Sequence, residues 1–132
     1  MIEAVSILAR YVYPSVKRRL VEILKTRYNL TQKEIANLLS LSQSLVSRYL
    51  NKSRGAYLDI SKAKETDREI RELVDMIMKN GSISAQELEY RLTIISLRAL
   101  GRGDICQFHK QIDPSRDPEK CNICKILFRT FL

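Results

Sequence analysis

The 132-residue sequence predicts an all-α protein. Its apolar residues recur three and four positions apart almost throughout, which is the spacing of helices and not the alternation of strands. Thr, Ser, Asn and Gly fall where such helices should begin and end. A chain of this length buries one modest core or two very small ones, so we expect a small binding module and not a multidomain enzyme.

The first two predicted helices cover residues 2–12 and 15–28, with Pro14 between them. The apolar side of the first consists of Ile2, Val5, Ala9 and Val12. Proline lacks a backbone N–H and its ring clashes with the preceding turn, so we expect Pro14 to interrupt the helix. The second helix should bury Val16, Leu20, Ile23 and Leu24.

A capping box, Thr31-Gln-Lys-Glu34, predicts the start of a third helix, because its hydroxyl and carboxylate can satisfy backbone N–H groups that a helix start leaves unpaired. Ser42 is typical of an N-cap and predicts a fourth helix that runs to about Asn51. The turn between them is short, and the small Ala36 lies where they would cross. Residues 31–51 therefore predict a helix-turn-helix.

The two faces of this helix pair differ in chemistry. The residues expected to face inward are Ile35, Leu39, Leu41, Val46, Tyr49 and Leu50. Those expected to face outward along the second helix are Ser42, Gln43, Ser44, Ser47, Arg48 and Asn51. Gln bonds bidentately to adenine, Ser bonds to donors or acceptors, and Arg bonds to guanine or phosphate. The outer face therefore predicts contact with double-stranded DNA.

The charge distribution favours the same partner. The chain has a formal net charge of +8, and residues 1–64 hold twelve Lys and Arg against four Asp and Glu. Residues 65–104 hold six against eight, so the positive excess lies in the N-terminal half. The residues expected to attract phosphate are Lys17, Arg18, Arg19, Lys33, Lys52 and Arg54.

The motif TQKEIANLLSLSQSLVSRYL, residues 31–50, resembles Xre and Cro type helix-turn-helix regulators, most closely predicted archaeal transcription regulators of that type. In such proteins the second helix lies in the major groove. The resemblance implies base contacts by Gln43, Ser44 and Ser47, and a phosphate contact by Gln32. Ser40 stands where this family usually has glycine, which adopts a positive φ at lower cost.

Two further helices should follow a linker over residues 56–65. A second capping box, Thr66-Asp-Arg-Glu69, predicts the start of the first, and Asn80-Gly81 predicts its end. Ser84-Ala-Gln-Glu87 predicts the start of the second, which should end near Gly101 and Gly103. Their apolar stripes consist of Ile70, Leu73, Val74, Ile77 and Met78, and of Leu88, Leu92 and Ile95.

These stripes can either cover the core of the same chain or pair with another subunit. A single helix-turn-helix contacts few base pairs, and operator symmetry usually mirrors the symmetry of the protein. We therefore expect a homodimer bound to double-stranded DNA.

The tail holds the only histidine and all three cysteines, in Cys106-Gln-Phe-His109 and Cys121-Asn-Ile-Cys124. Three thiols and one imidazole at this spacing are typical of a closed, structural zinc site, so all four residues are candidate ligands. An iron-sulfur cluster, which would make the protein a redox or iron sensor, is one alternative. Small buried thiols beside an ordinary histidine are the other. The resemblance to the archaeal regulators extends to this tail more loosely.

The predicted fold is thus an N-terminal helix-turn-helix bundle followed by two further helices and a short Cys/His-rich tail. We expect a DNA-binding domain over residues 1–58, a dimerisation or packing region over 59–104 and a metal-binding tail over 105–132. No apolar run reaches the length of a transmembrane span and no basic n-region begins the chain, so we expect a cytoplasmic protein without a membrane partner.

The predicted function is sequence-specific transcription regulation, with the helix at about 42–51 in the major groove. The alternative is a metal-dependent or redox-sensing adaptor that binds a protein partner and contacts nucleic acid nonspecifically. An enzyme is not expected, because the lone His109 lies among cysteines and no nucleophile stands beside a base.

Overall fold

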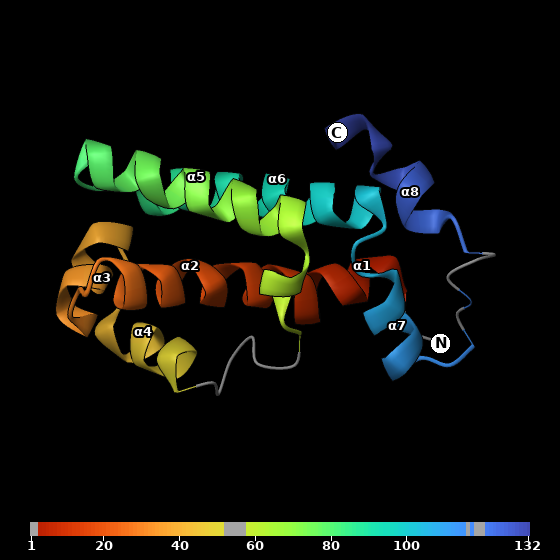
Figure 1. Ribbon diagram of the computed structural model, residues 1–132, viewed down its shortest axis with the longest axis horizontal. Coiled ribbons are helices and arrows are strands. Elements are labelled where there is room, and N and C mark those ends of the chain that lie inside the picture. The colour runs from red at the N-terminus through yellow and green to blue at the C-terminus, as the bar shows by residue number, and fades with distance from the viewer. Residues whose placement is uncertain (1–2, 52–57, 116, 118–120) are drawn as a thin grey trace.

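The computed structural model describes residues 3–51, 58–115, 117 and 121–132. Within these ranges every regular element is helical, which confirms the predicted all-α class. Figure 1 shows α2 (Tyr13–Arg27) running along the molecule, with α5 (Lys64–Asn80) and α6 (Ala85–Arg102) packed beside it. At one end lie α3 (Gln32–Leu39) and α4 (Gln43–Leu50). At the other lie α1 (Ala4–Ile7), α7 (Cys106–Ile112) and α8 (Ile123–Leu127). None of the described helices is long and apolar enough to span a lipid bilayer.

The N-terminal helix does not break at Pro14, so the predicted interruption is wrong. α1 continues through a π-helical turn, η1 (Leu8–Val12), directly into α2. In this turn the N–H of Tyr13 donates to the carbonyl oxygen of Leu8, five residues back. The π turn widens the helix just ahead of the proline, and Pro14 then lies in the first turn of α2, where the absence of an N–H is tolerated.

The predicted starts of α3 and α4 are confirmed. Thr31 Oγ1 accepts from the N–H of Glu34 at 3.1 Å, and Glu34 Oε1 accepts from the N–H of Thr31 at 3.0 Å, which completes the capping box. Ser42 Oγ accepts from the N–H of Leu45 at 3.2 Å. Both helices therefore begin at side chains that satisfy their first N–H groups.

The capping box predicted at Thr66 and Glu69 is wrong. α5 begins earlier, at Lys64, and both side chains are buried within it. They bind the C-terminal end of α6 instead. Thr66 Oγ1 donates to Asp104 at 3.0 Å, and Arg102 donates to Thr66 at 2.8 Å and to Glu69 at 2.6 Å. Thr66 and Glu69 therefore form tertiary contacts, although their spacing in the sequence predicted that they cap the start of α5.

The remaining helix boundaries follow the prediction. α5 ends at Gly81, with a φ of 86°, and α6 begins at Ser84, whose Oγ accepts from the N–H of Glu87 at 3.1 Å. α6 ends at Gly103, with a φ of 81°. Both glycines adopt the left-handed conformation that closes a helix at low cost.

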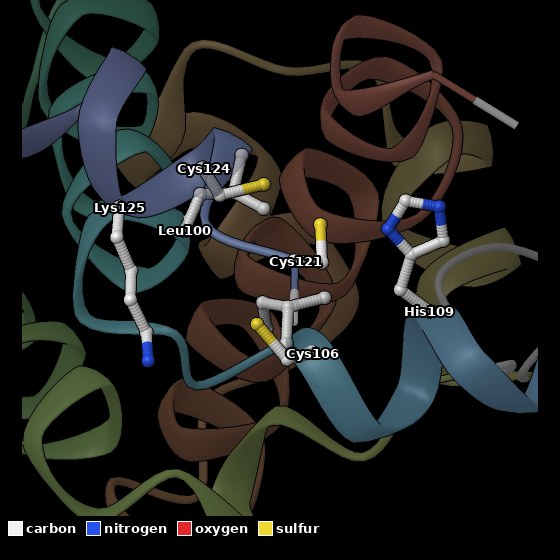
Figure 2. A pocket seen from close by; sticks show the side chains of 7 residues that line it. Leu100, Cys106, His109, Cys121, Cys124 and Lys125 are labelled. Carbon is white, nitrogen blue, oxygen red and sulfur yellow. The ribbon is translucent and has the colours of Figure 1, made fainter. Parts of the chain in front are cut away.

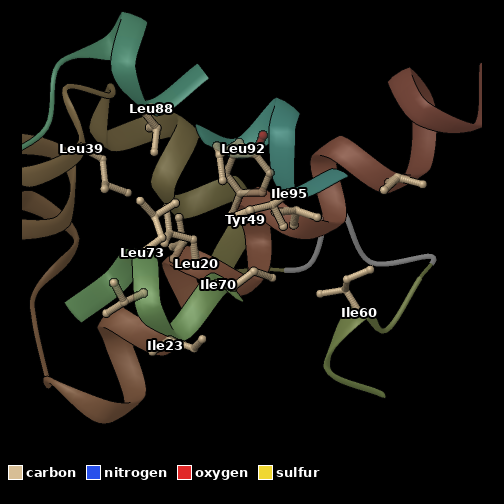
Figure 3. Close-up of a cluster of buried hydrophobic side chains, with 14 of the residues drawn as sticks. Leu20, Ile23, Leu39, Tyr49, Ile60, Ile70, Leu73, Leu88, Leu92 and Ile95 are labelled. Carbon is tan, nitrogen blue, oxygen red and sulfur yellow. The ribbon is translucent and has the colours of Figure 1, made fainter. Parts of the chain in front are cut away.

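One hydrophobic core joins the helices (Figure 3). It contains the predicted residues of α2 together with both predicted stripes, of which only Met78 is partly exposed. The stripes are therefore buried within a single chain. The predicted linker also reaches the core, because the 3-10 turn η2 (Ile60–Lys62) places Ile60 there with 2% exposure.

Candidate functional site

The turn between α3 and α4 is left-handed at Ser40, where φ is 57° and ψ is 40°. A positive φ costs a residue that has a Cβ atom roughly 1–2 kcal/mol. Ser40 Oγ donates to the carbonyl oxygen of Ile83 at 2.8 Å, and the N–H of Ile83 donates to the carbonyl oxygen of Leu38 at 3.0 Å. A hydrogen bond of this kind contributes about 1 kcal/mol. The hydroxyl therefore offsets much of the strain that serine adds at a position suited to glycine.

The outer face of α4 carries the polar side chains that the sequence predicted. Ser42, Gln43, Ser44, Arg48 and Asn51 are exposed and Ser47 is half-buried. On the opposite face Val46 and Tyr49 lie in the core. α4 is therefore amphipathic, with a polar face that is exposed and an apolar face that is buried.

Several polar atoms on this face bind one another. Asn51 Nδ2 donates to Ser47 Oγ at 3.2 Å, and the hydroxyl oxygens of Ser42 and Ser44 are 3.3 Å apart. Within the described ranges, the amide of Gln43 makes no hydrogen bond. This amide is exposed at the first turn of α4, so its donor and its acceptor are both available to a partner.

The basic residues near α4 divide into two groups. Lys17 lies beside α4, with its Nζ 5.9 Å from the centre of the Tyr49 ring and 6.0 Å from that of Tyr13. Arg18 and Arg19 instead form ion pairs within the chain, with Glu22 at 3.2 Å and with Asp67 at 2.7 Å respectively. The Arg18 pair lies within α2, whereas the Arg19 pair joins α2 to α5, a role that the charge count did not reveal.

Two of the other predicted DNA-contacting residues, Gln32 and Lys33, belong to α3. Gln32 is the first residue of α3 and is half-buried, and Lys33 beside it is exposed. Lys52 and Arg54 lie outside the described residues. The position of Lys17 between Tyr13 and Tyr49 was missed, because only the fold brings these three residues together.

The four predicted metal ligands line one small cavity at the far end of the molecule (Figure 2). Cys106 and His109 belong to α7, Cys121 precedes α8, and Cys124 lies on α8. The cavity volume is about 10 Å³, which is close to the room that one water molecule needs. Leu100, Ile105 and Lys125 complete the wall, and the sequence assigned none of these three to the Cys/His site.

The donor residues are shielded from water to different degrees. His109 and Cys124 are buried, whereas Cys106 and Cys121 are half-buried. Burial raises the pKa of the Cys106 thiol, and this effect outweighs the nearby Lys125 ammonium, which lowers it. Among the described residues, no three Cys, His, Asp or Glu side chains are arranged as a formed metal centre. What the four side chains share is the wall of one cavity.

The tail docks on α6 through two glycines. A Cβ atom on Gly101 would lie 2.8 Å from the backbone oxygen of Phe128, which is closer than real contacts allow. A Cβ atom on Gly103 would lie 2.7 Å from Lys125 Cε and 3.7 Å from Cys106 Sγ. The sequence assigned these glycines only to a helix end. Neighbouring residues in the sequence do not predict that these glycines contact the tail closely.

The candidate site thus has two separate parts, a polar helix face on α4 and a Cys/His cavity at the opposite end (Figure 1). Comparison of the chain with protein-family models, with curated proteins and with solved structures gives no match.

Proposed function

We propose that this protein is a sequence-specific, DNA-binding transcription regulator that inserts α4 into the major groove. The observation that carries the proposal is the exposed amide of Gln43, which has no hydrogen-bond partner among the described residues and lies on a polar face backed by a buried apolar one. The major groove is about 12 Å wide and admits an α-helix. α3 and α4 then act as a helix-turn-helix, of the Xre and Cro type that residues 31–50 resemble.

In this proposal the side chains divide between base and phosphate contacts. Gln43, Ser44 and Ser47 contact base edges, and a bidentate amide contact discriminates by about 1–3 kcal/mol between bases. Gln32 binds phosphate beside the start of α3, and Arg48 binds a guanine or a phosphate oxygen. Lys17 and Lys33 add attraction that does not depend on sequence and that weakens as salt rises.

We further propose that the regulator acts in the cytoplasm. We also propose that it binds DNA as a homodimer, because two symmetric copies would bind two half-sites. The apolar stripes of α5 and α6 are buried within the chain, so subunit contact would use another surface. The dimer thus requires no exposure of the core described in Figure 3.

Selection from a pool of random duplexes tests the DNA proposal. The full chain should enrich one sequence class and should bind it at least about a thousandfold more tightly than bulk DNA at physiological salt, as specific binders do. Binding that shows no sequence preference and disappears with salt would contradict the proposal and would favour a nonspecific adaptor.

A second proposal concerns the tail, and its support is the single cavity shared by Cys106, His109, Cys121 and Cys124. Three thiols and one imidazole suit zinc, and the small cavity lies between them. A bound Zn²⁺ would hold the thiols as thiolates and would tie α7 to α8. With four protein ligands no position stays open for catalysis, so the metal would have a structural role.

Elemental analysis with an absorption spectrum tests this second proposal on protein purified without oxygen. We expect one zinc per chain and no visible colour, and Cys121→Ser should lower the zinc content. Iron with a visible charge-transfer band would instead indicate an iron-sulfur cluster. Absence of both metals would contradict any metal role for the tail.

A further inference from the structure

We propose that a cavity between η2 and α7 binds a small organic anion with an apolar body. This inference goes beyond the proposed functions, because it requires neither DNA nor a metal. It depends on the size of the cavity, on the apolar side chains of its wall and on two lysines that form no ion pair within the described ranges.

The η2 cavity has a volume of about 490 Å³ and is formed by two segments that are distant in sequence. Residues of the segment 58–64, which contains η2, line one side. Residues of the segment 104–111, which contains most of α7, line the other. Sites for small molecules have volumes of roughly 300–1,000 Å³. The space is therefore large enough for a ligand and not only for water.

Part of the wall is apolar. Ile60 and Ile105 are buried, each with 2% exposure. Leu58 and Phe108 are half-buried and line the same cavity. Tyr11 packs edge-on against the Phe108 ring, with the two ring centres 5.3 Å apart, which restricts that ring. A ligand with an apolar body would cover the exposed part of Leu58 and Phe108, which the hydrophobic effect favours.

Two cations lie in the same wall. Lys62 and Lys64 are exposed, and neither forms an ion pair within the described ranges. Of the two lining carboxylates, that of Asp104 is already paired with Arg102, whose Nε lies 3.2 Å from Asp104 Oδ2. Asp59 supplies the other carboxylate. Two lysine ammonium groups therefore face one carboxylate that has no arginine partner, and this balance favours an anion.

The carboxylate of Asp59 is held within its own turn. Asp59 Oδ1 accepts from the hydroxyl of Ser61 at 2.5 Å and from the N–H of Ser61 at 3.2 Å, which caps η2. These two bonds lower the pKa of Asp59 more than the nearby charge of Lys62 does. The ammonium group of Lys62 is therefore not committed to Asp59 and stays available to a ligand.

A groove between α5 and α6 lacks this property. Its volume is about 430 Å³, and its wall also contains apolar side chains. Its three arginines, however, form ion pairs with glutamates of the same two helices: Arg68 at 2.5 and 2.8 Å, Arg91 at 2.8 Å and Arg98 at 3.4 Å. An anion would have to break these pairs in order to bind there. The lysines of the η2 cavity require no such exchange.

A ligand in the η2 cavity would contact two separate parts of the molecule. η2 is the next described element after α4 along the chain, and α7 carries Cys106 and His109. By contacting both segments, the ligand would stabilise their packed arrangement and reduce their local opening. Hydrogen exchange over both segments should therefore slow when the cavity is filled.

The probe for the test is 1-anilinonaphthalene-8-sulfonate, an anion with an aromatic body whose fluorescence rises when it binds apolar surface. The full chain is titrated without DNA, so failure here is distinguishable from failure of the proposed functions. We expect saturable binding at one site per chain that weakens as salt rises, because exposed charges contribute to it. In two-dimensional NMR spectra, amide shifts should change most over residues 58–64 and 104–111.

Lys62→Gln and Lys64→Gln test the role of the two cations. Each should weaken binding of the probe by about two- to fivefold, which is the effect of one exposed ion pair, and the double variant should weaken it further. Lys79→Gln removes the same charge from an exposed position at the other end of α5 and is the matched control. This control should bind the probe as wild type does.

The exposed apolar side chains of the tail are a competing site for the probe, with Ile126 at 59% and Leu127 at 55% exposure. Ile126→Ser distinguishes the two sites, because binding in the η2 cavity should survive this change. Absence of saturable binding, wild-type affinity in both lysine variants, or shift changes confined to residues 121–132 would each overturn the proposal. The wild-type shift map decides alone if a variant fails to fold.

Discussion

The hydroxyl of Ser40 and the carbonyl oxygen of Ile83 are 2.8 Å apart, in a hydrogen bond between segments 43 residues apart in sequence. Ser40 lies in the turn that leads to α4, and Ile83 lies in the loop that leads to α6. The bond therefore fixes the start of α4 against α6 as well as against α3. The polar face of α4 is thus oriented by the whole bundle and not by the helix pair alone.

Paired substitutions at Ser40 separate the hydrogen bond from the backbone strain. Ser40→Ala loses the hydroxyl but keeps the Cβ penalty, so we expect the free energy of unfolding to fall by about 1–2 kcal/mol. Ser40→Gly also loses the hydroxyl but relieves the strain, so its stability should stay within about 1 kcal/mol of wild type. Urea unfolding measures both, and equal losses in the two variants would contradict this account.

Gly101→Ala tests the docking of the tail. The added Cβ would meet the backbone oxygen of Phe128 at 2.8 Å, and backbone cannot move aside as a side chain can. We expect faster hydrogen exchange over residues 121–132 while α3 and α4 stay protected. Glu89→Ala, an exposed change on the same helix, is the control. Unchanged exchange in the tail of Gly101→Ala would show that the close contact is not maintained.

Asp67 links the stability of the bundle to pH. Burial alone would raise its pKa, but hydrogen bonds from Arg19 and Arg71 outweigh burial and hold the pKa below its usual value of 3.8. A carboxylate with a lowered pKa stabilises the folded state at neutral pH, and this contribution is lost as the pH falls below about 4 and through the lowered pKa.

Asp67→Asn should therefore destabilise the protein by about 1–3 kcal/mol at pH 7, since two charge-assisted hydrogen bonds are weakened. The difference from wild type should shrink at pH 3. Urea unfolding at both pH values measures this change. A stability difference of the same size at both would mean that the ionised carboxylate is not the cause.

The sequence predicts an element well where neighbouring residues determine it. The Thr31 and Glu34 capping box, the Ser42 and Ser84 caps, and the Gly81 and Gly103 ends depend on side chains and backbone angles within one turn. These boundaries were predicted correctly because their causes are local.

Errors arose where distant residues decide the outcome. Thr66 and Glu69 have the spacing of a capping box but bind Arg102 at the end of α6. The error at Pro14 has a local cause instead, because proline usually breaks a helix but the π turn directly ahead places Pro14 in the first turn of α2. α7 and α8 were described only as a Cys/His tail, because short helices depend on packing more than on their own pattern.

In the candidate sites, too, the sequence predicted the residues with a local pattern and missed those that only the fold brings to the site. Periodicity placed Gln43 and Arg48 on the outer face of α4, which the structure confirms. The Cys and His spacing predicted a cluster, and the cavity gathers all four residues. Lys125 was missed at that cavity, because a lysine in a charged tail has no distinguishing local signal.

The most direct test of the central claim compares Gln43→Ala with Gln111→Ala on the duplex that selection identifies. Gln111 is exposed on α7, at the end of the molecule away from α4, so the same amide is removed far from the proposed interface. If α4 contacts bases, Gln43→Ala should bind that duplex more weakly by about 1–3 kcal/mol and bind bulk DNA as wild type does, while Gln111→Ala changes neither. Equal binding of the selected duplex by Gln43→Ala and wild type would contradict the assignment of α4 to the major groove.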